Sequence, residues 1–348
     1  MMIQKNNNFI KDSLKQQEYS FLQSDIHLGN NIILLGVGGS YAYGIEKTDS
    51  TSDLDIRGIS LNSKEEILLN KDFEQVCDKN TDTVIYSFNK MIELLTKQNP
   101  NVIEILGLKP EHYLYLSKIG KELLNNKNMF LSKICIHTFG NYSSSQLRRM
   151  ENKAARLVGQ AQNEAYILKS INNAKYDFKN RYYPHDESDV KLYIDTAVQE
   201  GYDSEIFMDV CLKHYPLRDW AGMWNEMKAI VSSYNKIGKR NEKAISHDKL
   251  GKHMAHLIRL YMMCIDILEK EEIITYRTDE HDLLMSIRNG EFLDENRQPS
   301  TEFYDLLNEY EKRFDYAKNN TSLPDVPDHK RINEFKMYVN ERIVKGEV

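Results

Sequence analysis

Hydrophobic and polar positions follow one pattern in the first third of the chain and another in the rest. The run "NNIILLGV" (30–37) is short, apolar and rich in branched residues, as buried strands are. In "SDLDIRGIS" (52–60) polar and apolar residues alternate, which predicts a strand with one polar face. The polar residues of that face are Asp53, Asp55 and Arg57. Two further strands are predicted at 72–77 and 82–88, on either side of the turn "DKNT".

Helical periodicity dominates the remainder of the chain. A short amphipathic helix is predicted at 10–23, and "FNKMIELLTKQ" (88–98) changes to helical spacing directly after a strand. From about residue 110 the predicted helices are 111–126, 128–172, 190–213, 217–235, 248–270, 279–288, 301–318 and 329–345. The pattern therefore predicts an α/β (α+β) fold, with a mixed-sheet domain at 1–110 followed by an all-helical domain at 111–348.

The segment "NPNVIEIL" (99–106) has the signature of a helix start. Asn99 is a capping residue, Pro100 suits the first helical position, and Glu104 falls inside the helix. We interpret this segment as structural, positioning the sheet against the helical portion.

Composition narrows the class of protein. A chain of 348 residues is long enough for two domains, and its net charge of −6 excludes a globally basic nucleic-acid binder, though not a local basic groove. No apolar run reaches the roughly 18–20 residues of a membrane span, and the first residues lack the apolar region of a secretory signal. The four cysteines are far apart and form no metal-binding motif, so we expect reduced core thiols in a cytoplasmic protein.

The stretch "GVGGSYAYGIEKTDSTSDLDIRGIS" (36–60) carries the chemistry. Asp53 and Asp55 lie two residues apart on a strand and so converge on one patch, where two anions repel unless they share a proton or a cation. Gly38 and Gly39 allow a tight turn after the preceding strand, and Ser40 with the free N–H groups of a helix start would accept a phosphate. Carboxylates beside phosphate oxygens are what Mg²⁺ prefers, so this arrangement predicts a site for a magnesium-bound triphosphate, with two ions.

Each part of this motif is weak when taken alone. An isolated Asp-x-Asp is often a solvated turn, and Gly-Gly-Ser occurs by chance in many proteins. The order strand, Gly-Gly-Ser, helix, Asp-x-Asp strand is much more specific. Arg57 shares the face of the aspartates, where it would bind the triphosphate or neutralise the acidic cluster when no metal is bound.

This order resembles the nucleotidyltransferase signature of the DNA polymerase β superfamily. The stretch "GSYAYGIEKTDSTSDLDIRGI" is closer still to one branch, the predicted nucleotidyltransferases associated with RNA repair and RNA ligases (RlaP-like). "DTVIYSFNKMIELLTKQNPNVIEIL" (82–106) and "KHMAHLIRLYMMCIDILEKEEIITYRTDEHDLLMSIRNGE" (252–291) also resemble that branch. The resemblance implies a polymerase-β-like core followed by helices, with the active site in the cleft between the two domains.

Carried over by position, the resemblance assigns residues to roles. Gly39 and Ser40 would contact phosphate, and Asp53 and Asp55 would bind Mg²⁺ or Mn²⁺. The superfamily also uses a third carboxylate on a neighbouring strand, and Asp82, at the start of its strand, is our choice. Glu74 is the second candidate, and the alternative for Asp82 is a residue that closes the turn.

A basic helix face lies far downstream. At 100° per residue, Lys249, Lys252, His256 and Arg259 fall on one face of the predicted helix at 248–270, opposite its apolar residues. Between 228 and 259 there are eight Lys or Arg residues against two acids. This imbalance favours a surface that grips the triphosphate or the acceptor, and an ordinary solvated face is the alternative.

The resemblance implies transfer of NMP from an NTP such as ATP to a hydroxyl acceptor, with release of pyrophosphate. The preferred acceptor, an RNA or tRNA-like end in repair or modification, comes from the family association. A second interpretation is nucleotidylation of a protein or small molecule, which the acidic net charge favours mildly. A third is a non-catalytic nucleotide sensor. No membrane partner is expected.

Overall fold

The computed structural model of the chain describes residues 14–46, 54–155, 189–196, 204–211, 250–295 and 297–348, with a few single residues between 198 and 228. The chain folds into two compact units. The first unit comprises 1–143, 258–285 and 306–348, and the second comprises 144–257 and 286–305. Both units combine segments that are distant in sequence, and the boundary of a catalytic domain near residue 110 stays a prediction.

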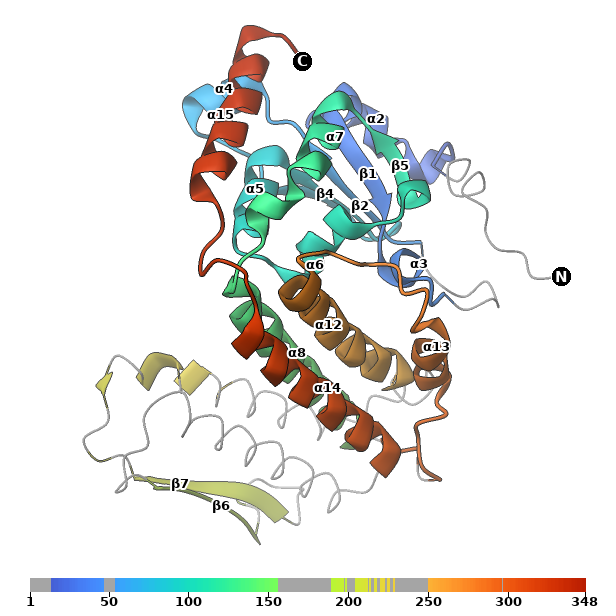
Figure 1. Cartoon of the computed structure of the whole chain (residues 1–348), viewed down its shortest axis with the longest axis vertical. Helices are drawn as coiled ribbons and strands as arrows, with labels where there is room; N and C mark the ends of the chain where they lie inside the picture. Colours follow the sequence, from blue (N-terminus) through green and yellow to red (C-terminus); the bar gives the residue numbers. More distant parts are fainter. Residues whose placement is uncertain are drawn as a thin grey trace, which may run out of the picture. The chain divides into compact units, whose positions relative to one another are not determined.

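A five-stranded mixed sheet forms the centre of the first unit (Figure 1). Its strands are β1 (Ile32–Val37), β2 (Ile56–Ser60), β3 (Gln75–Asp78), β4 (Thr83–Ser87) and β5 (Tyr113–Leu116). They are ordered β3-β4-β2-β1-β5. β2 and β4 pair in parallel and the other neighbours pair antiparallel. The mixed sheet and the α/β class are confirmed.

The fifth strand corrects the sequence analysis. The helix predicted at 111–126 is replaced by a 3-10 turn η4 (Pro110–His112), by β5 and by the shorter helix α7 (Lys118–Asn125). β5 pairs with the edge of β1, where Leu34 lies opposite Leu116. Its four residues, "YLYL", are too few to show a period within the helical pattern around them, so the pairing partner decides their conformation.

Capping residues explain where the helices of this unit begin. Ser87 ends β4, and its side chain accepts a hydrogen bond from the Lys90 N–H at the start of α5 (Phe88–Thr96). Asn99 caps α6 (Pro100–Ile103), as predicted, and Ser117 caps α7. The remaining helices and 3-10 turns before residue 131 are η1 (Gln17–Tyr19), α2 (Phe21–Ser24), η2 (Gly29–Asn31), α3 (Gly39–Tyr43), α4 (Lys64–Leu69), η3 (Glu104–Gly107) and η5 (Lys127–Phe130). The helix predicted at 10–23 is thus confined to η1 and α2 within the described residues.

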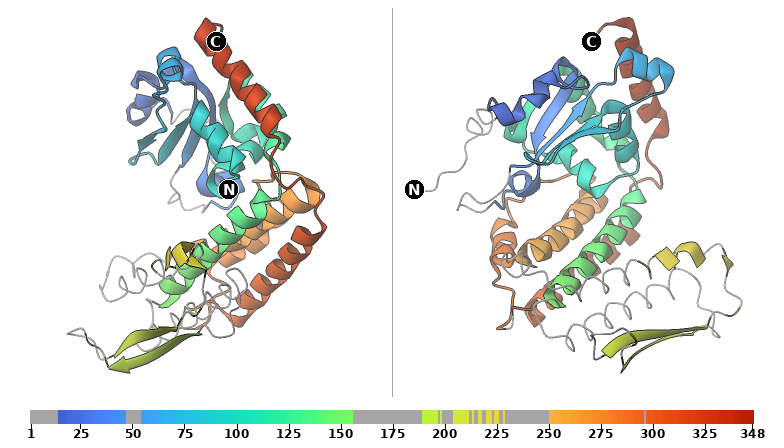
Figure 2. Two further views of the ribbon diagram at one scale, coloured as in Figure 1. Left: turned by 90° about the vertical axis from the view of Figure 1, so that its left-hand side faces the viewer. Right: turned by 180° about the vertical axis from the view of Figure 1, so that it is seen from behind.

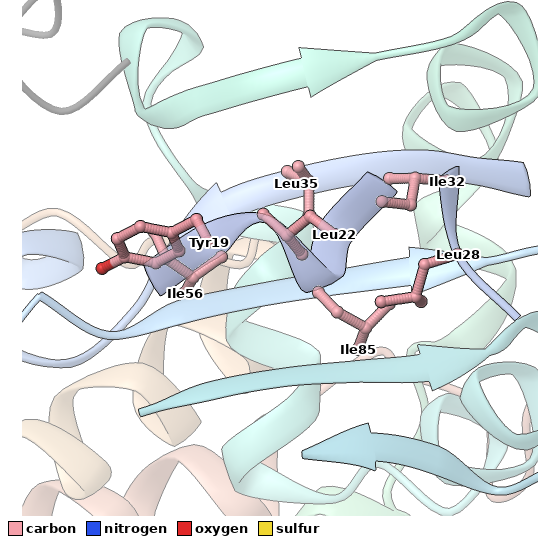
Figure 3. Packing of buried hydrophobic residues seen from close by; sticks show 7 residues of the cluster. All are labelled: Tyr19, Leu22, Leu28, Ile32, Leu35, Ile56 and Ile85. Carbon is pink, nitrogen blue, oxygen red and sulfur yellow. The ribbon is translucent and has the colours of Figure 1, made fainter. Parts of the chain in front are cut away.

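The N-terminal turns cover one face of the sheet. Tyr19, Leu22 and Leu28 pack there against side chains from three strands (Figure 3). The strand residues of this cluster are Ile32, Leu35, Ile56 and Ile85. Each fully buried aliphatic side chain contributes about 1.5–3 kcal/mol. Because Ile56 points into this core, Asp55 and Arg57 lie on the opposite face, as the alternation predicted.

The C-terminal helix α15 (His329–Lys345) completes the other side of the unit. It lies next to α4 and α5, as the views in Figures 1 and 2 show. The rings of Phe335 and Phe88 meet edge to face at 6.0 Å, and the Asn340 side chain donates a 3.0 Å hydrogen bond to Asn89 Oδ1. The other long helices are α8 (Ile134–Ala155), α12 (Leu250–Lys270), α13 (His281–Asn289) and α14 (Thr301–Asn320). A helical C-terminal region is therefore confirmed.

The second unit contains a β-hairpin that the sequence analysis missed. β6 (Asp189–Thr196) and β7 (Ser204–Cys211) pair antiparallel along their whole length. The helix predicted at 190–213 is therefore wrong, and the region after residue 110 is not all-helical. The period-two spacing of Val190, Leu192 and Ile194 is the feature of the sequence that indicates a strand here.

Two further sequence predictions can be compared with the structure. All four cysteines are unbridged, and Cys135 and Cys264 are buried, but Cys77 and Cys211 are exposed, so only half of them are core thiols. Within the described ranges, none of the helices combines the length and the apolar character needed to cross a bilayer.

Candidate active site

The glycine-rich turn adopts the predicted strand, turn and helix arrangement. β1 ends at Val37, Gly38 caps the helix, and α3 begins at Gly39 and includes Ser40. Gly39 has φ 55°, which an L side chain rarely adopts, and Gly44 ends the helix in the left-handed conformation with φ 75°. The turn thus requires glycine for its backbone conformation.

Asp55 packs directly on this turn. The Gly38 N–H donates a 2.8 Å hydrogen bond to the Asp55 carbonyl, which extends the pairing of β1 with β2 by one residue. A Cβ atom on Gly39 would lie 1.5 Å from Asp55 Oδ2, and one on Gly38 would lie 2.9 Å from Arg57 Cγ. The two glycines therefore leave the space that the Asp55 and Arg57 side chains fill.

Arg57 joins Asp55 to Asp82. Its Nη2 atom lies 3.5 Å from Asp55 Oδ1 and 3.3 Å from Asp82 Oδ1, and its Nη1 donates to the Asp82 carbonyl. The parallel register sets this geometry, because Ile56 lies opposite Thr83 and the two aspartates directly precede these residues. Two carboxylates on neighbouring strands thus converge on one cationic nitrogen.

The other predicted residues of this region are placed as follows. Asp53 lies outside the described residues. Ser40 is buried at the start of α3.

Glu74 pairs with Lys90 at 2.9 Å, on an exposed part of the surface. Asp82 has φ 46° and precedes β4, so it is a turn residue as well as a partner of Arg57. Of the two candidates for the third carboxylate, Asp82 is the one that shares a partner with Asp55.

The donor chemistry here suits a divalent metal ion. Asp55 and Asp82 offer carboxylate oxygens, which Mg²⁺ and Mn²⁺ prefer, around a position taken by a guanidinium nitrogen. In the described part of the chain, no group of three or more His, Cys, Asp or Glu residues is arranged to hold a metal. The described residues therefore supply two carboxylates, and Arg57 is the cation they hold.

A second cluster borders this site and was not predicted. Glu104, in η3, accepts a hydrogen bond from the Tyr43 hydroxyl through Oε2, and the Arg259 Nη1 atom lies 3.3 Å from the same oxygen. The Arg259 guanidinium also lies over the Tyr43 ring, 3.3 Å from its centroid. Glu104 further lines a small pocket with Gly38 and Arg57, which has room for about one water molecule. The cluster therefore lies beside the glycine turn and the arginine that bridges the aspartates.

Burial controls the proton affinity of the Tyr43 hydroxyl in this cluster. Burial raises the pKa of the Tyr43 hydroxyl well above its ordinary value, the Arg259 guanidinium lowers it, and the Glu104 carboxylate raises it again. Tyr43 is consequently a protonated donor, which matches its hydrogen bond to Glu104. The sequence carried a signal of this arrangement, because Glu104 stands within the apolar run "VIEIL", and a carboxylate in such a run needs a buried partner.

Arg259 does not occupy the position that we predicted. The helical wheel placed it on an exposed basic face, but only 3% of its side chain is exposed and it pairs with Glu104. The middle of α12 is buried nearly all round, so the assumption of one polar face fails there. Lys252 is exposed and His256 is partly buried, and both belong to the second unit. Lys249 lies outside the described residues. That Lys252, His256 or Arg259 binds the nucleotide stays a prediction.

The segment 273–277 closes around the same cluster. The Thr275 hydroxyl donates a 2.7 Å hydrogen bond to the Glu104 carbonyl, and its N–H donates to the Gly107 carbonyl at 3.2 Å. The Arg277 N–H donates to the Tyr43 carbonyl at 3.3 Å. The three stretches that carry the family resemblance in the sequence therefore meet at Tyr43, Glu104 and residues 259–277.

Comparison with known proteins agrees with this geometry. Residues 9–175 match the family described as "RlaP: RNA repair pathway DNA polymerase beta family". The matched range contains β1, the glycine turn, Asp55, Asp82 and Glu104. No curated protein and no solved structure matches the chain. Over residues 9–175 the chain is therefore similar to the RlaP-like branch of the DNA polymerase β superfamily, which agrees with the resemblance carried by its motifs.

Proposed function

We propose that this protein is a metal-dependent nucleotidyltransferase that transfers NMP from an NTP to a hydroxyl at the end of an RNA. The family is that of polymerase-β-like nucleotidyltransferases in RNA repair. The observation that carries the proposal is the convergence of Asp55 and Asp82 on one cationic nitrogen beside the turn at Gly38 and Gly39.

The proposed reaction is an in-line displacement at the α-phosphorus. The acceptor hydroxyl oxygen forms a bond to that phosphorus, the bond to the β-phosphate oxygen breaks, and pyrophosphate leaves. The hydroxyl proton passes to a carboxylate, for which Asp82 is our choice because more than half of its side chain is exposed to an entering acceptor. Mg²⁺ or Mn²⁺ bound by Asp53, Asp55 and Asp82 would stabilise the charge that develops on the phosphates.

The turn and Arg57 have roles that follow from their positions. The N–H groups at the start of α3 and the Ser40 hydroxyl would contact the triphosphate. Arg57 lies on the strand beside them and pairs with the two aspartates. Once a metal ion neutralises these carboxylates, the Arg57 guanidinium would pair with a phosphate of the nucleotide instead. A planar guanidinium suits both carboxylate and phosphate oxygens, so the exchange needs no other residue.

One experiment tests the proposal directly. The protein is incubated with each α-labelled NTP, Mg²⁺ or Mn²⁺, and total RNA or cell lysate. Label in RNA supports the proposed acceptor, label in protein or in a small molecule supports nucleotidylation of those targets, and bound but untransferred NTP supports a sensor. The double variant Asp53→Asn with Asp55→Asn should abolish transfer, and retained transfer would remove these residues from the mechanism.

A pair of variants distinguishes the two candidates for the third carboxylate. Asp82→Asn should lower kcat by about 10²-fold or more, the range expected when a general base is lost. Glu74→Gln should leave kcat nearly unchanged, because Glu74 is held by Lys90 at the surface. The reverse result would transfer the role to Glu74.

A further inference from the structure

The carboxylate of Glu104 connects three segments that are distant in sequence. Its Oε2 atom accepts a hydrogen bond from Tyr43 at the end of α3 and faces Arg259 of α12 at 3.3 Å. Glu104 itself lies in η3, directly after the capped helix α6. Only 13% of its side chain is exposed, so these two partners, rather than water, surround most of the Glu104 carboxylate.

Helix α3 begins at the glycine turn that we propose to bind the nucleotide, and it ends at Tyr43. α3 has five residues, from Gly39 to Tyr43, and a helix of about one turn is not stable on its own in water. Tertiary contacts must therefore hold it. At its N-terminal end, Gly38 and Gly39 pack against Asp55. At its C-terminal end, Tyr43 contacts Glu104, and a Cβ on Gly44 would lie 2.4 Å from the Tyr276 ring. The direction of the N–H groups at its first turn therefore depends on the contacts at both ends.

We propose that Glu104 is a positioning residue for nucleotide binding, which acts by holding Tyr43 and with it helix α3. The inference rests on the proposed function and deepens it, because it names the residues that keep the phosphate-binding turn in place. Arg259 then has a definite part: it neutralises Glu104 and packs on the Tyr43 ring. This assigns Arg259 to the support of the turn rather than to contact with the triphosphate.

The chain offers a matched pair of variants for the test. Tyr43→Phe removes the hydroxyl that donates to the Glu104 side chain. Tyr113→Phe removes a hydroxyl that donates a 2.9 Å hydrogen bond to the Ile105 carbonyl, in the same 3-10 turn η3. Each substitution deletes one tyrosine hydroxyl that donates a hydrogen bond to η3. Only Tyr43→Phe removes a hydrogen bond that connects α3 to η3.

Two measurements are made on both variants and on the wild type. The first is kcat and KM for the NTP in the labelled transfer assay. The second is amide hydrogen exchange at Ala42 and Ile45, whose N–H groups donate to the Gly38 and Ser40 carbonyls. We expect Tyr43→Phe to raise KM about fivefold with kcat within about twofold, and to speed the exchange by a similar factor, as loss of one hydrogen bond predicts. Tyr113→Phe should change neither by more than about twofold.

The outcomes separate this inference from the proposed function. A wild-type protein that transfers no NMP overturns the proposed function, and the exchange rates then decide whether Glu104 positions α3. Equal effects of the two variants overturn the inference, since that is what a purely structural hydroxyl would give. A raised KM without faster exchange in Tyr43→Phe also overturns it, because Tyr43 would then act on the nucleotide directly.

Discussion

Asp55 Oδ2 occupies the space that a Cβ atom on Gly39 would need, with only 1.5 Å between the two positions. Asp55 directly precedes β2 and Gly39 begins α3, so the contact joins the carboxylate to the glycine turn. Close approach of this kind is possible only for glycine, whose φ of 55° also suits it.

The first prediction concerns this contact. Gly39→Ala should lower the free energy of unfolding by more than about 1 kcal/mol and abolish nucleotide transfer, because the new methyl group displaces the Asp55 carboxylate and strains the backbone. The control is Gly140→Ala in α8, where a Cβ meets no atom within 4 Å and where alanine should stabilise the helix by about 1 kcal/mol. Urea unfolding monitored by circular dichroism measures the stability of both variants, and the labelled transfer assay measures their activity. A Gly39→Ala protein with wild-type stability would contradict the described position of Asp55.

The second prediction concerns the charge on Arg57. Arg57→Gln removes the cation that Asp55 and Asp82 share, so the two carboxylates should bind Mn²⁺ more tightly in the absence of nucleotide. Isothermal titration calorimetry should show about a tenfold lower Kd for Mn²⁺, equivalent to about 1.4 kcal/mol. Lys90→Gln is the control, because it removes a cation from the exposed Glu74. An unchanged Kd in Arg57→Gln would mean that Arg57 does not compete with the metal.

The third prediction concerns the stability of the buried pair. Glu104→Gln removes the carboxylate that faces the nearly buried Arg259 and should destabilise the protein by about 3–5 kcal/mol. Adding Arg259→Met should restore part of that loss, so a double-mutant cycle should give a coupling free energy of about 1–3 kcal/mol. The exposed pair of Glu341 and Lys345 is the control, and its cycle should give a much smaller coupling because solvent screens both charges. Additive effects of Glu104→Gln and Arg259→Met would show that the two charges do not support each other.

The fourth prediction concerns pH. Burial, with a smaller effect of Lys109, lowers the pKa of His112 below its ordinary value of 6.5. The unfolded chain therefore binds a proton more readily than the folded protein does, and stability from this group is present above about pH 6.5 and is lost as the pH falls toward the folded pKa. The free energy of unfolding should consequently decrease less between about pH 7.5 and about pH 5.5 in His112→Gln than in the wild type. Equal decreases in the two proteins would count against a neutral, buried His112.

Local sequence signals sufficed to predict most of the five-stranded sheet. The apolar run at 30–37, the alternation at 52–60 and the capping residue Asn99 each correspond to an element of the structure. They succeed because each depends on a contact within a few residues. The order of strand, glycine turn and helix before Asp55 is confirmed for the same reason.

The elements that sequence reasoning missed depend on distant partners. β5 forms because the edge of β1 accepts it, and nothing within "YLYL" distinguishes it from the flanking helical pattern. Arg259 was predicted to lie on an anion-binding basic face, because the wheel of α12 does not show that Glu104 and Tyr43 lie against it. The hairpin β6–β7 differs, since its alternation was visible and was outweighed by the helical pattern on both sides.

The first unit is assembled from segments that are distant in sequence. Glu104 and Arg259 are 155 residues apart, and Asn89 and Asn340 are 251 residues apart. A ribosome therefore releases the glycine turn and both aspartates long before it makes the arginine that neutralises Glu104. During that interval the Glu104 carboxylate has no Arg259 to pair with, so the cluster that holds Tyr43 can form only after residue 259 has been made.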